Sequence, residues 1–371
     1  MRIRRYNYSH QFDGDVAEIL QDFESMLLTG QYVLTPQVKE FELAFAQYTG
    51  TKHAIGVNSG TDALILAFTT AGIGRGDEVI TVANTFHATV SAIRVVGATP
   101  VLVDANPDTF LIDTDLIESA ISAKTKAIVP VHLFGRATDM DRIQSIAHAN
   151  GLMVIEDAAQ AHGAFTKGKR VGAIGNLGCF SFHPSKNLAA AGDGGMIVTD
   201  DDAMAESLRA LRSLGQQSQN EHVMVGFNSK LDALQARVLY QKLPRLDQWN
   251  AARRKVAAAY RKRLNNKQLY FQAFDDEQGH VFHLFQIGCN WRDQLMDFLR
   301  EQEIDATVRY PTPIHLQPAF ADCGWCSGQF PVAEKLADEL LCLPIRPDMS
   351  IEEVDYVCNA VENFFGTVVD A

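Results

Sequence analysis

Short apolar runs of strand length alternate with amphipathic segments of helical length through the first two-thirds of the chain. The strand-like runs are apolar at nearly every position, which is typical of strands buried on both faces. Strands of this kind, separated by helices, form a parallel sheet that helices cover on both sides. The sequence therefore predicts an α/β fold with a mostly parallel central sheet flanked by helices. The expected strands are 53–57, 78–83, 99–103, 127–133, 153–156, 178–182 and 196–199, and the expected helices are 36–48, 61–71, 88–96, 114–123 and 139–150.

The pattern changes after about Gly226. Residues 231–263 are rich in Ala, Leu, Arg and Lys and predict a long helix, broken near Pro244 because proline removes a backbone donor. We expect two closely packed domains, a large α/β domain of residues 1–245 and a smaller C-terminal α+β domain of residues 246–371. The small domain is expected to contain a strand near 280–289 and helices near 292–302, 332–341 and 351–365.

The composition of the chain argues against two classes of partner. A net charge of −12 without a basic stripe does not suit a nucleic-acid backbone, although a local site on an acidic protein can still bind a small anion. No apolar run approaches the ~20 residues that a membrane-spanning helix needs. The basic N-terminal residues have no apolar stretch behind them, so we expect no signal peptide, no membrane partner and a cytoplasmic location.

Cys323 and Cys326 form a C-x-x-C pair among six otherwise scattered cysteines. A thioredoxin-like site needs a strand before such a pair and a helix that starts at it. The surrounding residues, A-D-C-G-W-C-S-G-Q, are typical of a loop, and no second cysteine pair or nearby histidine completes a zinc site. We therefore expect reduced thiols without a redox or metal-binding role.

Ser59, Gly60 and Thr61 lie where an apolar strand ends and a helix begins. Backbone N–H groups, the helix dipole and two hydroxyl groups would converge there on an anion. A plain helix N-cap is the alternative interpretation of the same residues. The glycine-rich segment 72–76 superficially resembles a dinucleotide-binding loop, but it precedes a strand instead of a helix and predicts a tight turn.

Three further residues of interest follow other strands, at the end of the sheet where doubly wound folds bind ligands. Phe86 could stack on a planar cofactor, with core packing as the alternative. Asp157 ends an apolar strand and could hold a proton on a heterocycle nitrogen, with a metal site or an N-cap as alternatives. Lys186 follows the strand 178–182 and precedes the turn 192–195. A buried lysine is nucleophilic near neutral pH because burial lowers its pKa, whereas a random lysine is a surface residue.

Together, an anion-binding turn, an aromatic residue, a carboxylate and a lysine provide what pyridoxal phosphate requires. The cofactor needs a phosphate cradle, a stacking surface, a carboxylate on the pyridinium nitrogen and a lysine for a Schiff base. The combination is far more specific than any of its members. The sequence therefore favours a pyridoxal phosphate enzyme.

Long ordered motifs over nearly the whole chain carry a family resemblance. They are N-S-G-T-D-A-L (58–64), G-D-E-V-I (76–80), P-V-H-L-F-G (130–135), E-D-A-A-Q-A-H-G (156–163), S-F-H-P-S-K-N-L (181–188), G-F-N-S-K-L-D-A-L-Q-A (226–236) and Y-P-T-P-I-H-L-Q-P-A-F (310–320). With these motifs the chain resembles the DegT-type (DegT/DnrJ/EryC/StrS) sugar aminotransferases, which are pyridoxal phosphate enzymes of fold type I. The resemblance implies that fold and that cofactor.

The resemblance also implies roles for single residues. Lys186 corresponds to the Schiff-base lysine and proton carrier, Asp157 to the partner of the pyridinium nitrogen, and Phe86 to the stacking residue. Gln160 is implied near the phenolic oxygen of the cofactor. The implied phosphate contacts are Ser59, Gly60, Thr61 and Ser181.

Asn228 matches a residue that reaches the phosphate of the neighbouring subunit's cofactor, which implies a homodimer with active sites at the subunit interface. Tyr32, Tyr310 and His315 fall in segments that line the sugar pocket of the family. Two positions depart from the family pattern. Lys230 stands where arginine is common, and Arg309 stands where histidine often precedes Tyr-Pro, which weakens any inference about the sugar.

The implied reaction transfers the amino group of L-glutamate to a nucleotide-linked (dTDP or UDP) keto-deoxysugar, giving 2-oxoglutarate and an amino sugar. Lys186 favours transfer, because relatives that dehydrate sugars carry histidine at this position. The motif S-K-N-L followed by G-D-G-G resembles members that act at C3 of the sugar. The alternatives are a C4-keto-sugar or keto-cyclitol aminotransferase, or a non-catalytic cofactor-binding regulator, for which the chain has no evident helix-turn-helix extension or basic patch.

Overall fold

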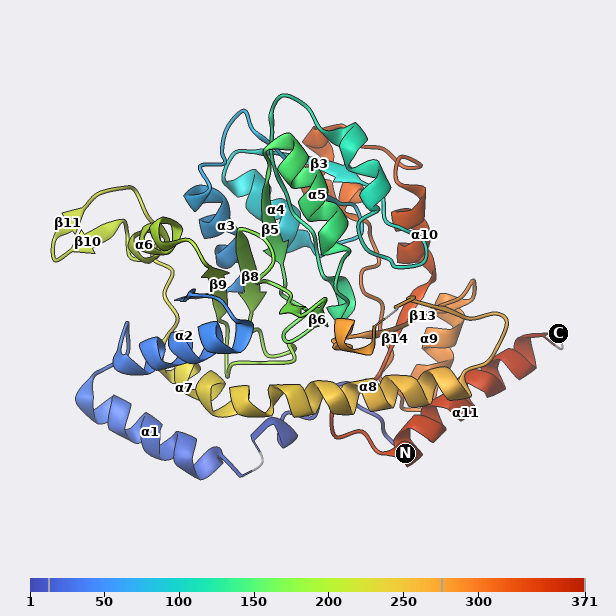
Figure 1. Ribbon diagram of the computed structural model, residues 1–371. Helices are drawn as coiled ribbons and strands as arrows, with labels where there is room; N and C mark the ends of the chain where they lie inside the picture. The colour runs from blue at the N-terminus through green and yellow to red at the C-terminus, as the bar shows by residue number, and fades with distance from the viewer. Residues whose placement is uncertain (13, 275, 370–371) are drawn as a thin grey trace.

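A seven-stranded sheet forms the centre of the computed structural model, which describes residues 1–12, 14–274 and 276–369. The strand order is β1-β9-β8-β5-β4-β2-β3 (Figure 1). β9 runs antiparallel to both of its neighbours, and the remaining pairings in this sheet are parallel. The predicted α/β fold with a mostly parallel sheet is therefore confirmed. The strands are β1 His53–Val57, β2 Glu78–Val82, β3 Thr99–Val103, β4 Thr125–Ile128, β5 Met153–Asp157, β8 Leu177–Ser181 and β9 Gly195–Thr199.

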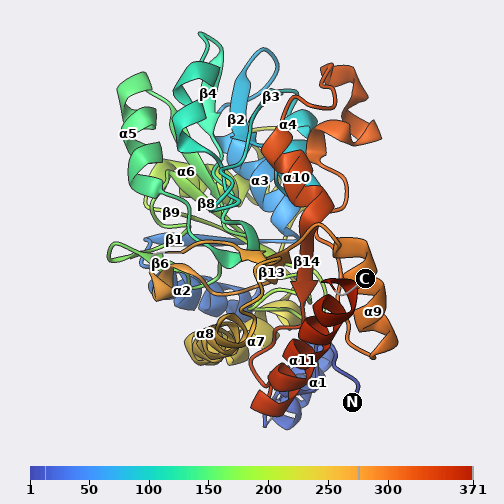
Figure 2. The same ribbon diagram turned by 90° about the vertical axis from the view of Figure 1, so that its right-hand side faces the viewer.

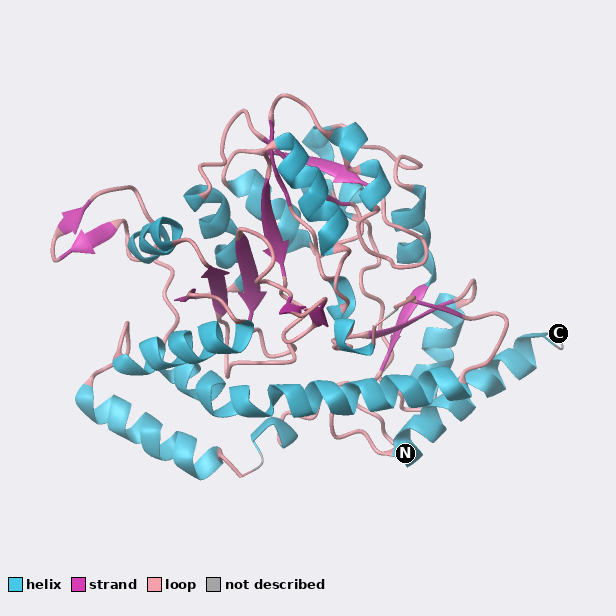
Figure 3. Ribbon diagram, in the orientation of Figure 1, coloured by secondary structure: helices cyan, strands magenta, loops and turns pink. Residues whose placement is uncertain are grey.

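Helices cover both faces of this sheet because its strands are apolar on both sides (Figure 3). In β8, Leu177 and Cys179 belong to the core under one set of helices, whereas Phe180 belongs to the core under the other set. The first set comprises α3 Gly60–Thr70, α4 His87–Val95 and α6 Asp202–Leu211. The second set comprises α2 Pro36–Thr49, α5 Met140–Asn150 and α7 Ala233–Lys242.

The C-terminal part forms a second unit around a three-stranded antiparallel sheet, with β12 Tyr270–Phe271, β13 Phe285–Gly288 and β14 Leu340–Leu343. Its core joins the long helix α8 to α9 and α11. As predicted, the helical connector is broken at Pro244, by a 3-10 turn between α7 and α8. Figure 2 shows α10 beside α4, and the two helices share a core cluster, so the second unit also packs on the first. The bounds are α8 Leu246–Arg263, α9 Arg292–Glu301, α10 Pro331–Glu339 and α11 Ile351–Val369. The boundary at residue 245 stays a prediction.

Three predicted elements differ in the structure. The helix expected at 114–123 is replaced by the 3-10 turns Thr114–Leu116 and Glu118–Ala120, because short polar side chains bond nearby backbone and compete with a helix. The strand expected at 127–133 ends at Ile128, two residues before a proline that cannot donate to the sheet. The strand β14 was expected to end a helix, and it pairs instead with β13. Among the described residues, no helix is long and apolar enough to cross a membrane.

Candidate active site

A pocket of about 430 Å³ lies at the carboxyl ends of β1, β5 and β8. It brings together predicted residues from five separate parts of the chain, which confirms that the strand ends converge. The predicted site residues that line it are Ser59, Gly60, Thr61, Phe86, Asp157, Gln160, Ser181, Lys186 and Tyr310.

The N-terminus of α3 forms one end of this pocket. Ser59 is the N-cap, and its Oγ accepts a hydrogen bond from the backbone N of Asp62 at 3.1 Å. Gly60 packs so closely on β8 that a Cβ there would lie 2.6 Å from the Cβ of Ser181. This close approach places Ser59, Thr61 and Ser181 around one helix N-terminus, an arrangement that suits a phosphate. Ser59 is therefore a helix N-cap, and the anion-binding role of this helix N-terminus stays a prediction.

Asp157 lies at the end of β5 and is buried. Its Oδ2 accepts a hydrogen bond from Thr89 Oγ1 at 2.8 Å, and its Oδ1 accepts one from the backbone N of Ala159 at 3.2 Å. Burial raises the pKa of this carboxyl, while the two hydrogen bonds and the charge of Lys186 oppose the rise. A buried carboxylate with neutral hydrogen-bond donors suits a cationic partner, because a positive charge restores its ordinary pKa.

Thr89 is a site residue that the sequence analysis missed. Its Oγ1 also lies 2.9 Å from Thr85 Oγ1, so the two threonines form a chain that ends on Asp157. Both residues are buried near the start of α4. Thr85 precedes the N-cap Phe86 and Thr89 lies in the first turn of α4, so the position of both threonines at a predicted helix start after a strand is the signal that could have identified them.

Lys186 lies in a tight turn that follows β8. Its backbone N donates a hydrogen bond to His183 O at 2.8 Å, and this bond closes the turn. Burial, aided by the charge of Arg309 and opposed by that of Asp157, lowers the pKa of its amine to about 8. Although the residue is surrounded by protein, part of its side chain remains accessible from the pocket. A substantial fraction of the amine is therefore neutral and nucleophilic near pH 8.

Phe86 and Tyr310 form an aromatic wall of the pocket, with ring centroids 5.2 Å apart. Phe86 keeps 47% of its surface exposed, which favours a stacking role over core packing. Gln160 is fixed between two partners. Its Nε2 donates to Tyr310 Oη at 3.0 Å, and its Oε1 accepts from the backbone N of Phe134 at 2.7 Å.

Three predicted site residues lie outside this pocket in the single chain. Tyr32 is partly exposed and its hydroxyl donates to Leu27 O at 3.0 Å. Asn228 is exposed and contacts Lys230. His315 is buried, with Nε2 at 2.9 Å from Glu334 Oε1. Their implied roles stay predictions.

Comparison with known proteins agrees with this geometry. A family model described as the DegT/DnrJ/EryC1/StrS aminotransferase family matches residues 14–362. The chain belongs to this family. It is therefore an aminotransferase, and the resemblance seen in the motifs is confirmed.

Relatives in this aminotransferase family carry two kinds of name. A Geobacillus stearothermophilus protein named "Pleiotropic regulatory protein" is 44% identical over 98% of this chain and 99% of its own length. The dTDP-3-amino-3,6-dideoxy-alpha-D-galactopyranose transaminase of Aneurinibacillus thermoaerophilus is 43% identical over 98% of each chain. The UDP-N-acetyl-3-dehydro-alpha-D-glucosamine 3-aminotransferase of Acidithiobacillus ferrooxidans is 42% identical over 93% of each chain.

Two crystal structures show the same fold. S. venezuelae DesV in complex with a ketimine intermediate has a TM-score of 0.95 and 40% identity, with 98% of each chain covered. NtdA from Bacillus subtilis with bound cofactor PMP has a TM-score of 0.91 and 32% identity, with 98% of this chain and 85% of that chain covered. The predicted fold type is thereby confirmed.

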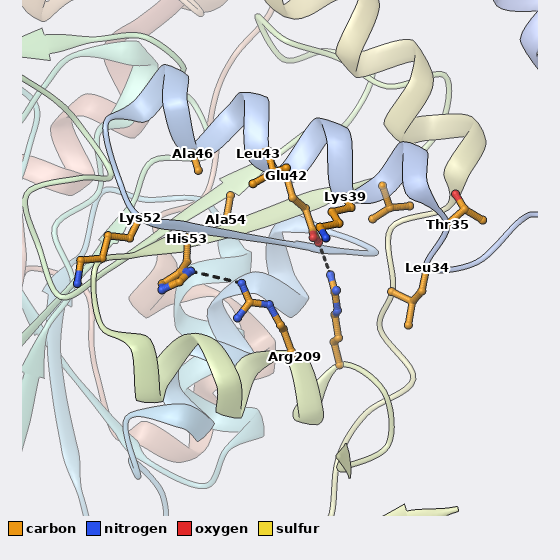
Figure 4. Close-up of a pocket in the computed structure, with 12 residues that line it drawn as sticks. Leu34, Thr35, Lys39, Glu42, Leu43, Ala46, Lys52, His53, Ala54 and Arg209 are labelled. Carbon is orange, nitrogen blue, oxygen red and sulfur yellow. Dashed lines mark hydrogen bonds and ion pairs between the residues drawn. The ribbon is translucent and has the colours of Figure 1, made fainter. Parts of the chain in front are cut away.

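A second cavity, of about 470 Å³, lies elsewhere, between α2 and α6 (Figure 4). Its charged side chains are at the surface or already paired. Arg209 lies 3.4 Å from His53, and Glu42 is paired with the buried Arg212. This cavity contains neither a buried lysine nor an aromatic wall, so it does not suit an aminotransferase site. Among the described residues, no cluster of His, Cys, Asp or Glu suits a metal ion.

Proposed function

We propose that the protein uses pyridoxal phosphate to transfer the amino group of L-glutamate to C3 of a nucleotide-linked keto-deoxysugar. The observation that carries this proposal is Lys186, an amine with a pKa of about 8 in the same pocket as the buried carboxylate of Asp157. Transaminases need both groups, an amine that reacts with an aldehyde and a carboxylate that keeps a pyridine ring protonated.

The residues of the pocket fit this cofactor. Ser59, Thr61 and Ser181 surround the helix N-terminus that would hold its phosphate, and Asp157 would hold its ring nitrogen. Phe86 offers an exposed ring face for stacking. When bound, pyridoxal phosphate supplies an electron sink that stabilises negative charge at the carbon bearing the amine.

Lys186 performs the proton transfers in this proposal. Its neutral Nζ would remove the proton from the α-carbon of glutamate and give that proton up as the amine leaves glutamate. In the second half-reaction the same Nζ would deliver a proton to the sugar carbon that receives the amine. Asp157 stays ionised and keeps the ring charge in place, while Thr89 and Ala159 fix the orientation of its carboxylate. Gln160 and Tyr310 fix each other's side chains on the pocket wall through their hydrogen bond.

The regulator named among the relatives represents a second candidate function. Its identity to this chain equals or exceeds that of the transaminases, so overall similarity does not separate the two. The intact pair of Lys186 and Asp157, with a lowered lysine pKa, favours catalysis. The printed names of dTDP- and UDP-sugar 3-transaminases among the relatives support C3 over C4 and over a cyclitol.

A panel of keto-sugars tests the substrate assignment. We expect glutamate-dependent amination of dTDP- or UDP-linked 3-keto sugars to be at least about tenfold faster than that of their 4-keto isomers. A site whose polar groups hydrogen-bond the 3-keto sugar leaves some of these groups unpaired when the 4-keto isomer binds. Mass spectrometry of the products measures this preference. Faster conversion of 4-keto sugars or of a keto-cyclitol would contradict it.

We also propose a homodimer. The hairpin of β10 Gln216–Ser218 and β11 Glu221–His222 projects from the body of the subunit (Figure 1). The segment that follows exposes apolar side chains, with Val225 94% accessible, and leads directly to Asn228. Exposed apolar segments of this kind mark interaction surfaces. The partner is a second copy of the chain, in which Asn228 would approach the neighbouring helix N-terminus.

Replacing Val225 and Met224 with glutamate is expected to dissociate the dimer, because it places charge in an apolar interface. Analytical ultracentrifugation should show a dimer for the wild type and a monomer for this variant. Ile351→Glu is the matched control, since Ile351 is an exposed apolar residue at the start of α11, far from the hairpin. A monomeric wild-type protein would contradict the dimer.

A further inference from the structure

The N-terminal strap, residues 3–12, lies across the two units of the subunit. Its first part is held by the C-terminal unit through an isolated bridge between Ile3 and Ile304. The guanidinium of Arg346 donates to Arg4 O at 2.9 Å, and Asn7 Nδ2 donates to Asp348 Oδ2 at 2.6 Å. These contacts fix the backbone on both sides of residues 5 and 6.

The far end of the strap is held by the large unit. The buried Lys242 donates from Nζ to Gln11 Oε1 at 2.8 Å and to Ala189 O at 2.6 Å, and it lies 4.6 Å from the ring centroid of Phe12. Ala189 is three residues beyond Lys186, so the strap is attached to the loop that carries the reactive lysine. The strap is therefore held at both ends next to the active site.

Between these attachments, Tyr6 and Tyr8 line the mouth of the active-site pocket. Their rings are stacked, with centroids 5.7 Å apart and an angle of 16° between the planes. The guanidinium of Arg5 lies 5.6 Å from the Tyr6 centroid, and Tyr8 remains 50% exposed. Tyr8 is therefore the accessible member of a preorganised aromatic pair.

A cation lies in the same pocket. Arg309 lines it, and among the described residues no carboxylate lies within ion-pair distance of its guanidinium. Its charge contributes to the lowered pKa of Lys186, which lines the same pocket. An unpaired guanidinium in a pocket suits a phosphate or carboxylate group of a ligand.

We propose that Tyr8, supported by Tyr6, stacks on the base of a nucleoside diphosphate, and that Arg309 pairs with its phosphates. This inference rests on the proposed function, because the nucleotide would be the one linked to the keto-sugar. The half-buried Lys186 and the exposed Tyr8 place the sugar inside the pocket and the base at its mouth. A neutral cyclitol would use neither the aromatic pair nor the cation, so the subsite itself selects nucleotide-linked substrates.

Binding of dTDP and UDP to the cofactor-loaded protein tests the subsite by isothermal titration calorimetry. Tyr8→Ala is expected to weaken binding of the nucleotide that the wild type prefers by about tenfold or more, since base stacking on an aromatic ring is worth that much. Tyr8→Phe keeps the ring and should bind within about twofold of wild type. Tyr240→Ala, which removes a partly exposed tyrosine on α7, is the matched control and should bind like wild type.

Inorganic pyrophosphate separates the two contacts. Its binding should be insensitive to Tyr8→Ala, and Arg309→Gln should weaken it and reduce its dependence on salt. Equal nucleotide affinity of the wild type and Tyr8→Ala would overturn the subsite. The glutamate half-reaction of the wild type, followed by cofactor absorbance, separates this failure from failure of the proposed function. A protein that reacts with glutamate but binds neither dTDP nor UDP remains an aminotransferase and has no such subsite.

Discussion

Lys186→Ala is expected to reduce amino transfer from glutamate to the keto-sugar by at least about 10³-fold. The replacement removes both the nucleophile that binds the cofactor and the base that moves the proton, and general acid–base catalysis alone contributes about 10²–10⁴-fold. Steady-state kinetics measure the loss. Lys39→Ala, on the edge of the cavity between α2 and α6, is the control and should retain wild-type turnover.

A second measurement identifies the attachment point directly. After borohydride reduction of the loaded wild-type protein, mass spectrometry should find the cofactor on the peptide that contains Lys186. The rate at which the apoprotein captures the cofactor should rise with pH and level off above about 8, because the amine becomes neutral there. Retained turnover in Lys186→Ala without an added amine would contradict the assignment. It would also make the regulator named among the relatives the better guide to function.

Asp157→Ala is expected to lower turnover by about 10²–10³-fold, which is typical when a preorganised electrostatic group is removed from a catalytic site. The turnover of Asp157→Asn should fall by a comparable factor. Its amide oxygen can still accept from Thr89, so the variant removes the charge and keeps a hydrogen bond. A comparable loss in both variants would show that the negative charge of Asp157, and not only the hydrogen bond to Thr89, keeps the ring nitrogen protonated.

The stability of Asp157→Asn separates catalysis from folding. Burial raises the pKa of Asp157 above its value in the unfolded chain, so ionisation of this carboxyl opposes folding. The stability that the protonated carboxyl contributes to the apoprotein is therefore lost as the pH rises through the folded-state pKa. At pH 7 to 8 the neutral asparagine should therefore leave the melting temperature of the apoprotein unchanged or higher. Near-normal turnover would assign the ring nitrogen to another residue, and a large drop in melting temperature would make Asp157 structural.

The sequence predicted the sheet and the set of chemical groups because both depend on local patterns. Apolar runs of strand length placed Ser59, Phe86, Asp157 and Lys186 after different strands, and parallel strands bring such positions to one edge. The same reasoning failed at β14, which has no length or turn signal to separate it from the helix before it. Local pattern also missed the two 3-10 turns at 114–120, where polar side chains compete with the helix.

By itself, the sequence determined the family to which the chain belongs and predicted which residues carry the chemistry, because both follow from the order of its motifs along the chain. Only the tertiary structure decided what surrounds them. Thr89 on Asp157, Arg309 near Lys186 and the tyrosine pair at the mouth arise from segments far apart in the chain. Burial and the pKa of Lys186 depend on these long-range contacts, which no local periodicity encodes. The fold thus lowers the pKa of Lys186 to about 8, and the N-terminal strap places Tyr6 and Tyr8 in the same pocket.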